Sequence, residues 1–391
     1  MGVITDLVEA APMILSEEQI AIRNLARDFA RRQLQPNSAQ RDREGHFPKA
    51  ALSQMGEMGF MGMLVPEQYG GAGLDHVSYV LALEEVAYGD GSCSTIMGVQ
   101  NSVVCMPILR FGTAAQKERF LPPLARGTML GAFCLTEAQA GSDAAAIRTR
   151  AVRVGQRWVI NGAKQFITSG ANAEVAIVFA VTDPEAGRHG ISAFIVPTAT
   201  PGWKVVRVEN KLGQHASDTA QLAFEDLAVT SDLLLGGEGE GYRIALSNLE
   251  GGRIGIGAQA VGMALAAYET ALDYASERET FGRKIIDHQA VAFRLADMAT
   301  EIEAAWQLVL HAASLRDSGQ TCIREASMAK LFASEMAERV CSRALQTFGG
   351  NGYLEDYPVA RIYRNVRACQ IYEGTSDIQR LVIARHLRDT H

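Results

Sequence analysis

The spacing of hydrophobic and polar positions changes twice along the chain. From residue 16 to about residue 126, apolar side chains recur every three to four residues, which is the period of helices packed on a core. The first segment, SEEQIAIRNLARDFARRQLQP, opens with Ser16 as a helix N-cap and Gln19 three residues later. We expect this helix to end before Pro36, and Pro122 and Pro123 to interrupt the last helical segment of the zone.

Between about Gly127 and Gly236 the pattern becomes that of short strands. Segments rich in β-branched and aromatic residues alternate with Gly, Pro and Asn-Gly turns, as in a domain built of β-hairpins. These segments are RWVINGAKQFIT, AEVAIVFAVT, ISAFIVP, WKVVRV and AQLAFEDLAV.

After Gly236 the helical period returns and holds to the end of the chain. Three long helices are expected, and each carries small residues on an apolar face, which favours close packing in a bundle. The predicted fold is therefore α+β and multidomain. Residues 1–126 form an N-terminal α-helical domain, residues 127–236 a middle β-sheet domain of barrel or sandwich type, and residues 237–391 a C-terminal α-helical domain like a four-helix bundle.

Composition narrows the class of protein. With 391 residues, 48% of them hydrophobic, and a net charge of −7, the chain has no excess of basic residues for nucleic-acid binding. No apolar run approaches the ~20 residues that cross a bilayer, so no membrane span is expected. The first residues, MGVITDLVEAAPM, contain two acids and no base, unlike a secretory or transit peptide, and we expect a cytoplasmic protein.

The cysteines and histidines predict no metal site. The six cysteines include no CxxC pair and the eight histidines no HxxxH or HxH pair, so the thiols are expected to be small buried side chains in a reducing compartment. Residues 255–260, GIGAQA, fit a dinucleotide-binding pattern, but no strand precedes them and they lead into an apolar helix. We interpret them as small residues for helix packing.

Four other stretches carry candidate chemistry, and each has a structural alternative. Thr136 and Ser142 could bind a polar ring edge or phosphate oxygens, or belong to an ordinary turn. Phe166 and Thr168 alternate on an expected strand, so they share a face that could stack on a flat cofactor or fill the core. The third stretch, ERETFGRKI, is basic and lies between apolar helices, and its alternative is an ordinary exposed loop. The fourth is the glycine-rich QTFGGNGY, whose backbone could approach a ligand closely or simply cap a helix.

Taken together, the motifs are more specific than any one of them. FCLTEAQAGSD, NGAKQFITSG, KLGQHASDT, ERETFGRKI, QTFGGNGY and IYEGTSDIQR stand in the order and spacing of the acyl-CoA dehydrogenase family of flavoproteins, which the chain resembles over essentially its whole length. Within that family, the sequence most resembles the short-chain and short branched-chain members. The order of helices, strands and helices fits that family's architecture.

The resemblance implies an FAD site between the β domain and the C-terminal helices, completed by a neighbouring subunit in a homotetramer built as a dimer of dimers. The residues expected at the flavin half are Phe133, Leu135, Thr136, Ser142, Phe166, Thr168, Thr375, Ser376 and Asp377. Those expected at the adenine and diphosphate half, mostly from the partner chain, are Arg278, Phe281, Gln289, Gln346, Gly349 and Gly350.

Glu373 of IYEGTSDIQR matches the family's catalytic base. It follows Ile371 and Tyr372, whose apolar walls would raise the pKa of the carboxyl toward neutrality, and it precedes Gly374, which leaves room for substrate. The implied reaction removes the pro-R α-proton with Glu373 while the β-hydride passes to flavin N5, which gives a trans-2-enoyl-CoA. The thioester oxygen would be held by the Glu373 N–H and a flavin ribityl hydroxyl, and electrons would pass to an electron-transferring flavoprotein.

Acyl-CoA is expected to contact a further set of residues, namely Ser142, Leu249, Glu250, Arg253, Tyr372 and Gly374. Three positions are informative when compared with the family pattern, because they either differ from it or distinguish its subfamilies. Gly252 stands where isovaleryl-type members carry their base, Glu250 where aspartate is more usual, and Phe166 where many members have tryptophan. The last change puts any role of an indole in electron transfer in doubt.

Other functions on the same fold stay open. A flavin-dependent monooxygenase or a nitroalkane-oxidase-like enzyme would generally lack Glu373, and acyl-CoA oxidases are usually longer chains. A non-catalytic protein would have little reason to keep Glu373 and Arg253 together with the flavin residues. The GVQNSVVCMP segment lacks the consecutive small residues of a long tunnel, so an acyl chain of four to six carbons is expected. A carrier-protein thioester in place of CoA also stays open.

Overall fold

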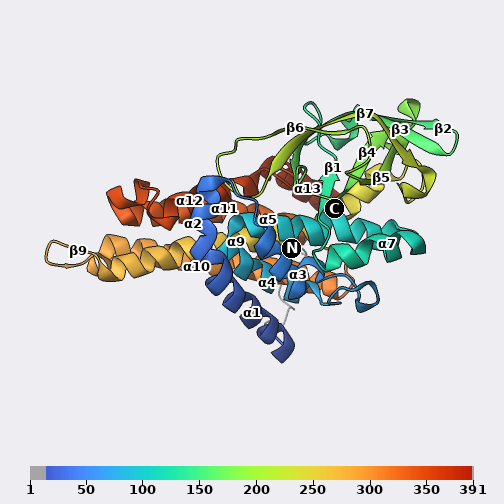
Figure 1. Cartoon of the computed structure of the whole chain (residues 1–391). Helices are drawn as coiled ribbons and strands as arrows, with labels where there is room; N and C mark the ends of the chain where they lie inside the picture. Colours follow the sequence, from blue (N-terminus) through green and yellow to red (C-terminus); the bar gives the residue numbers. More distant parts are fainter. Residues whose placement is uncertain (1–14, 390–391) are drawn as a thin grey trace.

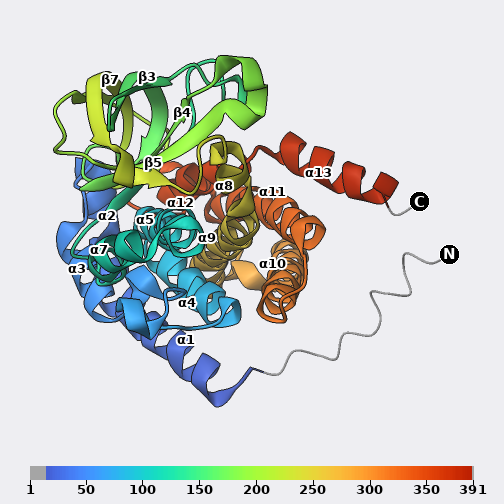
Figure 2. The ribbon, with the colours of Figure 1, turned by 90° about the vertical axis from the view of Figure 1, so that its right-hand side faces the viewer.

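The computed structural model describes residues 15–389. Helices lie side by side in an elongated layer, and a β domain covers one end of it (Figure 1). Seen end-on, helices α4, α9, α10 and α11 pack as a bundle below and beside the sheet (Figure 2). The predicted order of helices, strands and helices is confirmed. The domain limits at residues 126 and 236 stay predictions.

The N-terminal region is helical, as expected. Its helices are α1 (Glu17–Phe29), α2 (Gln35–Glu44), α3 (Lys49–Glu57), α4 (His76–Gly89), α5 (Gly91–Val99), α6 (Met106–Phe111) and α7 (Ala114–Ala125). Ser16 caps α1, and its side chain and that of Gln19 satisfy each other's backbone N–H groups. This cap could be predicted because it depends on four consecutive residues.

The proline predictions in this region are wrong. Pro36 does not end the helix, because a π-helical turn, Ala30–Leu34, carries α1 on into α2 and places Pro36 in the first turn of α2. A proline is tolerated there, since an N–H in a first turn lacks an intrahelical partner. Pro122 and Pro123 lie inside α7. Phe120, Leu121 and Leu124 of this helix are buried, and this packing overrides the local preference.

The middle region forms one mixed sheet. Its strands are β1 (Gly131–Cys134), β2 (Arg150–Val154), β3 (Arg157–Thr168), β4 (Val175–Val181), β5 (Ile191–Pro197), β6 (Trp203–Val208), β7 (Thr219–Thr230) and β8 (Leu234–Leu235). The order is β6-β7-β3-β2-β4-β5-β8, with β1 parallel to β4. The predicted segments correspond to β3–β7, whereas β1, β2 and the parallel pairings were not foreseen.

The C-terminal region contains the three long helices that were predicted. They are α9 (Leu249–Glu277), α10 (Gln289–Asp317) and α11 (Ile323–Phe348), preceded by α8 (Gly241–Ser247) and followed by α12 (Pro358–Val366) and α13 (Ser376–Asp389). A small hairpin, β9 (Glu279–Thr280) and β10 (Arg283–Lys284), joins α9 to α10. Residues 255–260 lie inside α9, as interpreted. A side chain at Gly262 would come within 2.1 Å of the Glu84 carbonyl, so glycine lets α9 approach α4.

One sequence expectation about apolar runs needs correction. The helical stretch Gly91–Phe111 has 21 residues and a mean hydropathy of 1.2, long and apolar enough to cross a bilayer by length and composition. However, 78% of the apolar window in this stretch is buried inside the protein, as in a core helix.

All six cysteines are free and buried. The segment MGVITDLVEAAPM lies outside the described residues.

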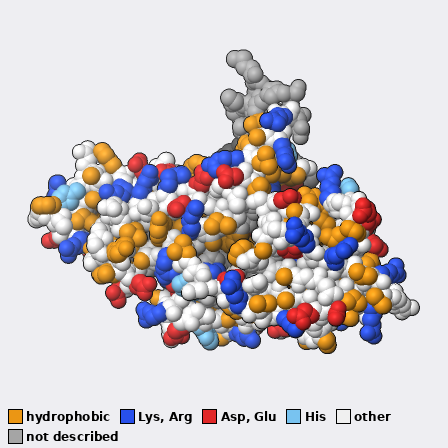
Figure 3. All heavy atoms as spheres, turned by 90° about the horizontal axis from the view of Figure 1, so that it is seen from above, with side chains coloured by type: hydrophobic (Ala, Val, Ile, Leu, Met, Phe, Trp, Pro, Cys, Tyr) orange, Lys and Arg blue, Asp and Glu red, His pale blue; other side chains and the backbone are white. Residues whose placement is uncertain are grey.

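The surface carries mixed charges. Basic and acidic side chains are interspersed over the face shown in Figure 3, as the small net charge predicts. Among the described residues, no group of three or more His, Cys, Asp and Glu side chains is placed to hold a metal ion.

Candidate active site

Glu373 lies in a strained turn between the short helical segment Arg367–Gln370 and α13. Its φ is 55°, in the left-handed region that non-glycine residues rarely adopt, and Gly374 follows with φ 89°. The turn places the Glu373 side chain on the wall of a cavity of about 660 Å³. Its Oε2 atom is buried and accepts no hydrogen bond. A buried, unpartnered carboxylate oxygen facing a cavity is unusual, and it points to chemistry there.

Two buried side chains hold this turn from behind. The Lys330 Nζ of α11 donates to the Gly374 carbonyl at 2.6 Å. The Gln379 amide of α13 donates to the carbonyls of Glu373 at 3.1 Å and Gly374 at 2.8 Å. Both backbone carbonyls of the left-handed dipeptide are therefore occupied, and this fixes the direction of the Glu373 side chain.

The electrostatics of Glu373 suit a base at neutral pH. Burial raises the pKa of its carboxyl to about 7, although the positive charges of Arg253 and Lys330 act in the opposite direction. A Cβ at Gly252 would lie 2.6 Å from Oε2, so the carboxylate rests directly on α9 and glycine is needed there. A carboxyl with a pKa close to the ambient pH is half ionised and takes up protons readily.

The cavity brings together many of the residues expected at the flavin and the acyl-CoA. Its walls come from β1 and the following turn, from β3, from α9 and from the segment after α12. The expected residues among them are Phe133, Leu135, Thr136, Ser142, Phe166, Thr168, Glu250, Arg253, Tyr372, Glu373 and Gly374. The side chain of Leu249, which opens α9, lies outside the described part of the structure.

The three residues after Gly374, which are Thr375 before α13 and Ser376 and Asp377 at its start, do not line the cavity. The hydroxyl of Thr375 accepts from the N–H of Ile378 at 3.4 Å, and so caps this helix. The Ser376 hydroxyl is buried without a partner, whereas the Asp377 side chain is exposed. Ser376 therefore has a free hydrogen-bonding group at the edge of the site.

Strand β3 departs from the simple alternation expected for Phe166 and Thr168. A register shift between Lys164 and Ile167, with φ 59° at Phe166, marks a bulge. The bulge leaves the Phe166 ring 60% exposed, yet both residues line the cavity. Lys164, fully buried, donates to the Leu135 carbonyl at 3.0 Å and ties the bulged strand to β1.

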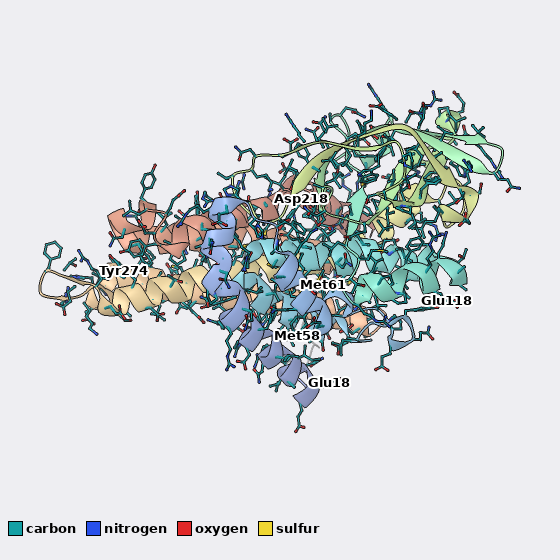
Figure 4. The ribbon with its side chains drawn as sticks, in the orientation of Figure 1. Glu18, Met58, Met61, Glu118, Asp218 and Tyr274 are labelled. Carbon is teal, nitrogen blue, oxygen red and sulfur yellow. The ribbon has the colours of Figure 1, made fainter. Side chains whose placement is uncertain are left out.

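The residues expected at the adenine half lie elsewhere. Arg278, Phe281, Gln346, Gly349 and Gly350 line a second hollow of about 500 Å³. Gln289 begins α10 beside it and is not among its lining residues. The second hollow also contains Tyr274, which Figure 4 places near the β9 end of the helices, away from the sheet. One chain thus does not bring the two groups together, and the Phe281 side chain is 96% exposed.

Sequence reasoning missed three residues of this site. Tyr79 of α4 is buried, lines the cavity and has no partner for its hydroxyl. Gln259 of α9 also lines the cavity, and Lys330 holds the Glu373 turn. The available signal was a polar residue on an otherwise apolar helix face, which occurs at Gln259 and Lys330 but does not by itself identify a site.

Comparison with known proteins assigns the family. Three family models match: the acyl-CoA dehydrogenase N-terminal domain over residues 16–128, the middle domain over 132–227 and the C-terminal domain over 239–388. The chain belongs to the acyl-CoA dehydrogenase family. The expectation drawn from the motifs is confirmed, and members of this family are oxidoreductases that act on CH–CH groups.

The relatives of this acyl-CoA dehydrogenase family member match along its whole length. An acyl-CoA dehydrogenase of Bacillus subtilis (strain 168) is 49% identical over 96% of the chain and 99% of the relative. A mitochondrial short-chain specific acyl-CoA dehydrogenase of Bos taurus is 46% identical over 95% of the chain and 90% of the relative. The structure of butyryl-CoA dehydrogenase from Megasphaera elsdenii has a TM-score of 0.95 and 42% identity, covering 97% of this chain and all of that one.

Proposed function

We propose that the protein catalyses the FAD-dependent α,β-dehydrogenation of a short or short branched-chain acyl-CoA to the trans-2-enoyl-CoA. The observation that carries the proposal is the Glu373 carboxyl. It is buried on the wall of the large cavity, has an unpartnered oxygen and has a pKa raised to about 7. An α-proton beside a thioester is weakly acidic, and a base freed from water is suited to remove it.

The donor set beside Glu373 fits a flavin. The hydroxyls of Thr136 and Ser142, from the loop after β1, line one cavity together with the Phe166 ring and the Thr168 hydroxyl of β3, and Ser376 offers a buried hydroxyl without a partner. Hydroxyls suit the polar edge of an isoalloxazine ring, and a phenyl face suits stacking. When bound, the flavin supplies the acceptor for the hydride that leaves Cβ.

The chain's own residues then have defined roles in the mechanism. Glu373 takes the α-proton on its carboxylate, and its backbone N–H is the proposed donor to the thioester oxygen, where negative charge grows. The positive charge of Arg253, buried on α9, favours the ionised form of Glu373 before substrate binds. The apolar walls around the carboxylate exclude water that would lower its basicity.

A hydrogen-bonded polar cluster forms one part of the cavity wall, and we call it the polar floor. We define it by Ser94, Thr95, Gln259 and Tyr372, all of which line the cavity. The Gln259 amide donates to the hydroxyls of Ser94 at 2.8 Å and Thr95 at 2.6 Å, and its carbonyl accepts from the Tyr372 hydroxyl at 2.5 Å. A longer acyl chain would have to break these bonds, and a distal carboxylate would find only neutral side chains in this floor. Both points favour a short, uncharged acyl group.

We expect the highest kcat/KM on butyryl-, hexanoyl- or short branched acyl-CoA, and a shift to longer chains in Gln259→Ala. Each buried methylene contributes ~0.8 kcal/mol, so every pair of carbons that the pocket cannot house should cost roughly tenfold in specificity. The variant should raise the ratio of octanoyl- to butyryl-CoA kcat/KM by about tenfold or more, measured with a series from C4 to C16 that includes branched C4 and C5 thioesters.

The matched control is Gln116→Ala, which removes another buried glutamine that donates to two carbonyls but does not line the cavity. It should lower the melting temperature and leave the chain-length profile unchanged. A wild-type maximum at C12 or longer would refute the floor argument while leaving the role of Glu373 untouched.

The experiment that tests the function uses the purified protein. It should be yellow, its flavin should bleach on anaerobic mixing with butyryl-CoA, and air should reoxidise it slowly, with electrons passing instead to an electron-transferring flavoprotein. Fast reoxidation by oxygen would favour the alternative, an oxidase or a flavin-dependent monooxygenase on this fold. A colourless protein that binds no added FAD would overturn both.

A further inference from the structure

Lys330 is a fully buried lysine whose position no ion pair explains. It lies in α11 with 0% of its surface exposed. Its Nζ donates to the Gly374 carbonyl at 2.6 Å, and within the described residues no carboxylate oxygen lies within the 4.0 Å of an ion pair. An ammonium is strongly hydrated in water, so its burial against a neutral oxygen is unfavourable for folding.

The titration of Lys330 reflects that burial. Desolvation lowers the pKa of the ammonium to about 8, with smaller opposing contributions from the nearby Cys369 and Glu373. The protein thus keeps a buried cation close to the candidate base, at a cost in stability that a methionine of similar length would avoid.

Lys330 contacts the turn that carries Glu373. Glu373 itself has φ 55°, a conformation that costs free energy for a residue with a side chain and persists only where the surroundings enforce it. Lys330 and Gln379 supply that enforcement from α11 and α13, by donating to the backbone carbonyls of Glu373 and Gly374.

We propose that Lys330 is a positioning residue for Glu373: its ammonium holds the Gly374 carbonyl, fixes the left-handed turn and keeps the base ionised. This rests on the proposed function, in which Glu373 removes the α-proton. Lys330 itself touches neither the substrate nor the reacting atoms, because it approaches the turn from the side of α11.

Other charged and titratable groups face Glu373 and must be separated from Lys330. Arg253 of α9 also lowers the pKa of Glu373, and its effect is larger than that of Lys330. The charge of Glu373 in turn raises the pKa of the Tyr79 hydroxyl of α4. Glu250 of α9 and Arg385 and His386 of α13 line the same cavity. Lys330 combines a positive charge with a hydrogen bond to the turn.

The sign of the pH effect follows from the charge. A cation stabilises the carboxylate, so loss of Lys330 raises the pKa of Glu373 and moves the acid limb of kcat/KM to higher pH. In the wild type, activity should rise as pH passes about 7, where Glu373 ionises.

Two substitutions distinguish the charge from the hydrogen bond. In Lys330→Met both are lost, and we expect kcat to fall about tenfold at pH 8 and about 100-fold at pH 6, with KM near the wild-type value. In Lys330→Gln a neutral donor remains, so kcat at pH 8 should recover toward the wild type while the acid limb stays shifted. Lys211→Met is the matched control, because Lys211 also donates to a backbone carbonyl, that of Ser217 at 2.7 Å, in the β domain.

Hydrogen exchange of the holoenzyme provides a readout independent of activity. The amides of residues 371–379 should exchange faster in Lys330→Met, by about tenfold or more, at an intermediate rate in Lys330→Gln and at the wild-type rate in Lys211→Met. If both Lys330 variants melt at lower temperature but keep the wild-type exchange and pH midpoint, the lysine is merely structural and the proposal is overturned. If exchange rises as expected but wild-type enzyme oxidises no acyl-CoA, the proposed function fails while the hold on the turn stands.

Discussion

Glu373→Gln should lose turnover by about 10³-fold or more while it keeps bound FAD and substrate affinity. The carboxamide is nearly isosteric with the carboxylate, so it fits over Gly252, but it cannot take a proton at neutral pH. Stopped-flow reduction of the flavin by butyryl-CoA measures the chemical step, and a spectral titration with the enoyl-CoA product measures binding. The two together distinguish a lost base from a disordered site.

Glu250→Gln is the control for Glu373→Gln. Glu250 lines the same cavity but its carboxylate is paired with Arg316 at 2.6 Å, which makes it a poor base. We expect this variant to change KM more than the chemical step. If Glu373→Gln keeps activity within about tenfold of wild type, the base lies elsewhere, and Glu250 is the first residue to test.

The same Glu373→Gln substitution should stabilise the fold at alkaline pH. The pKa of Glu373 is raised above its ordinary value, so the contribution of this group to stability is fully present below about pH 4.5 and is lost as pH rises through about 7. A neutral glutamine avoids that loss. We expect a melting temperature higher by about 1–3 °C at pH 8 and unchanged at pH 5. Equal effects at the two pH values would show that the carboxyl is not desolvated.

Arg278→Ala should lose FAD on dilution, with an affinity lower by about 100-fold. Arg278 lines the second hollow, at the β9 end of the helices, whereas most of the residues proposed to bind the flavin line the first cavity. An extended dinucleotide can use both groups only if a neighbouring subunit brings its second hollow to the first cavity. An arginine fork matches pyrophosphate oxygens, and its loss typically costs ~3 kcal/mol for a charged hydrogen-bonded contact.

Light scattering and absorbance on the same column test this linkage between cofactor and assembly. The wild type should be a yellow tetramer built from dimers, and added FAD should restore the variant at high protein concentration. Arg283→Ala is the matched control, since Arg283 lies in the same hairpin but does not line the second hollow. A yellow wild-type monomer would contradict the shared site.

The sequence by itself determined the features that depend on neighbouring residues or on the period of the hydrophobic pattern. The change of hydrophobic period marked the helix–strand–helix order, because periods of 3.6 and 2 follow from backbone geometry alone. The Ser16 cap depends on neighbours within one turn. The motif IYEGTSDIQR predicted Glu373 as the candidate base, since an acid between apolar residues and a glycine suits a desolvated carboxyl.

Only the tertiary structure decided how distant segments meet. The turn at Glu373 is held by Lys330, 43 residues away in the sequence, and no periodicity reports such a contact. Pro122 and Pro123 stay helical in α7 because packing outweighs local preference, and the bulge at Phe166 depends on pairing with β7. The two groups of predicted cofactor residues lie apart because α9 and α10 carry the hairpin to the far end of the bundle. Contacts between residues far apart in the chain depend on which surfaces pack together, and only the folded arrangement determines that.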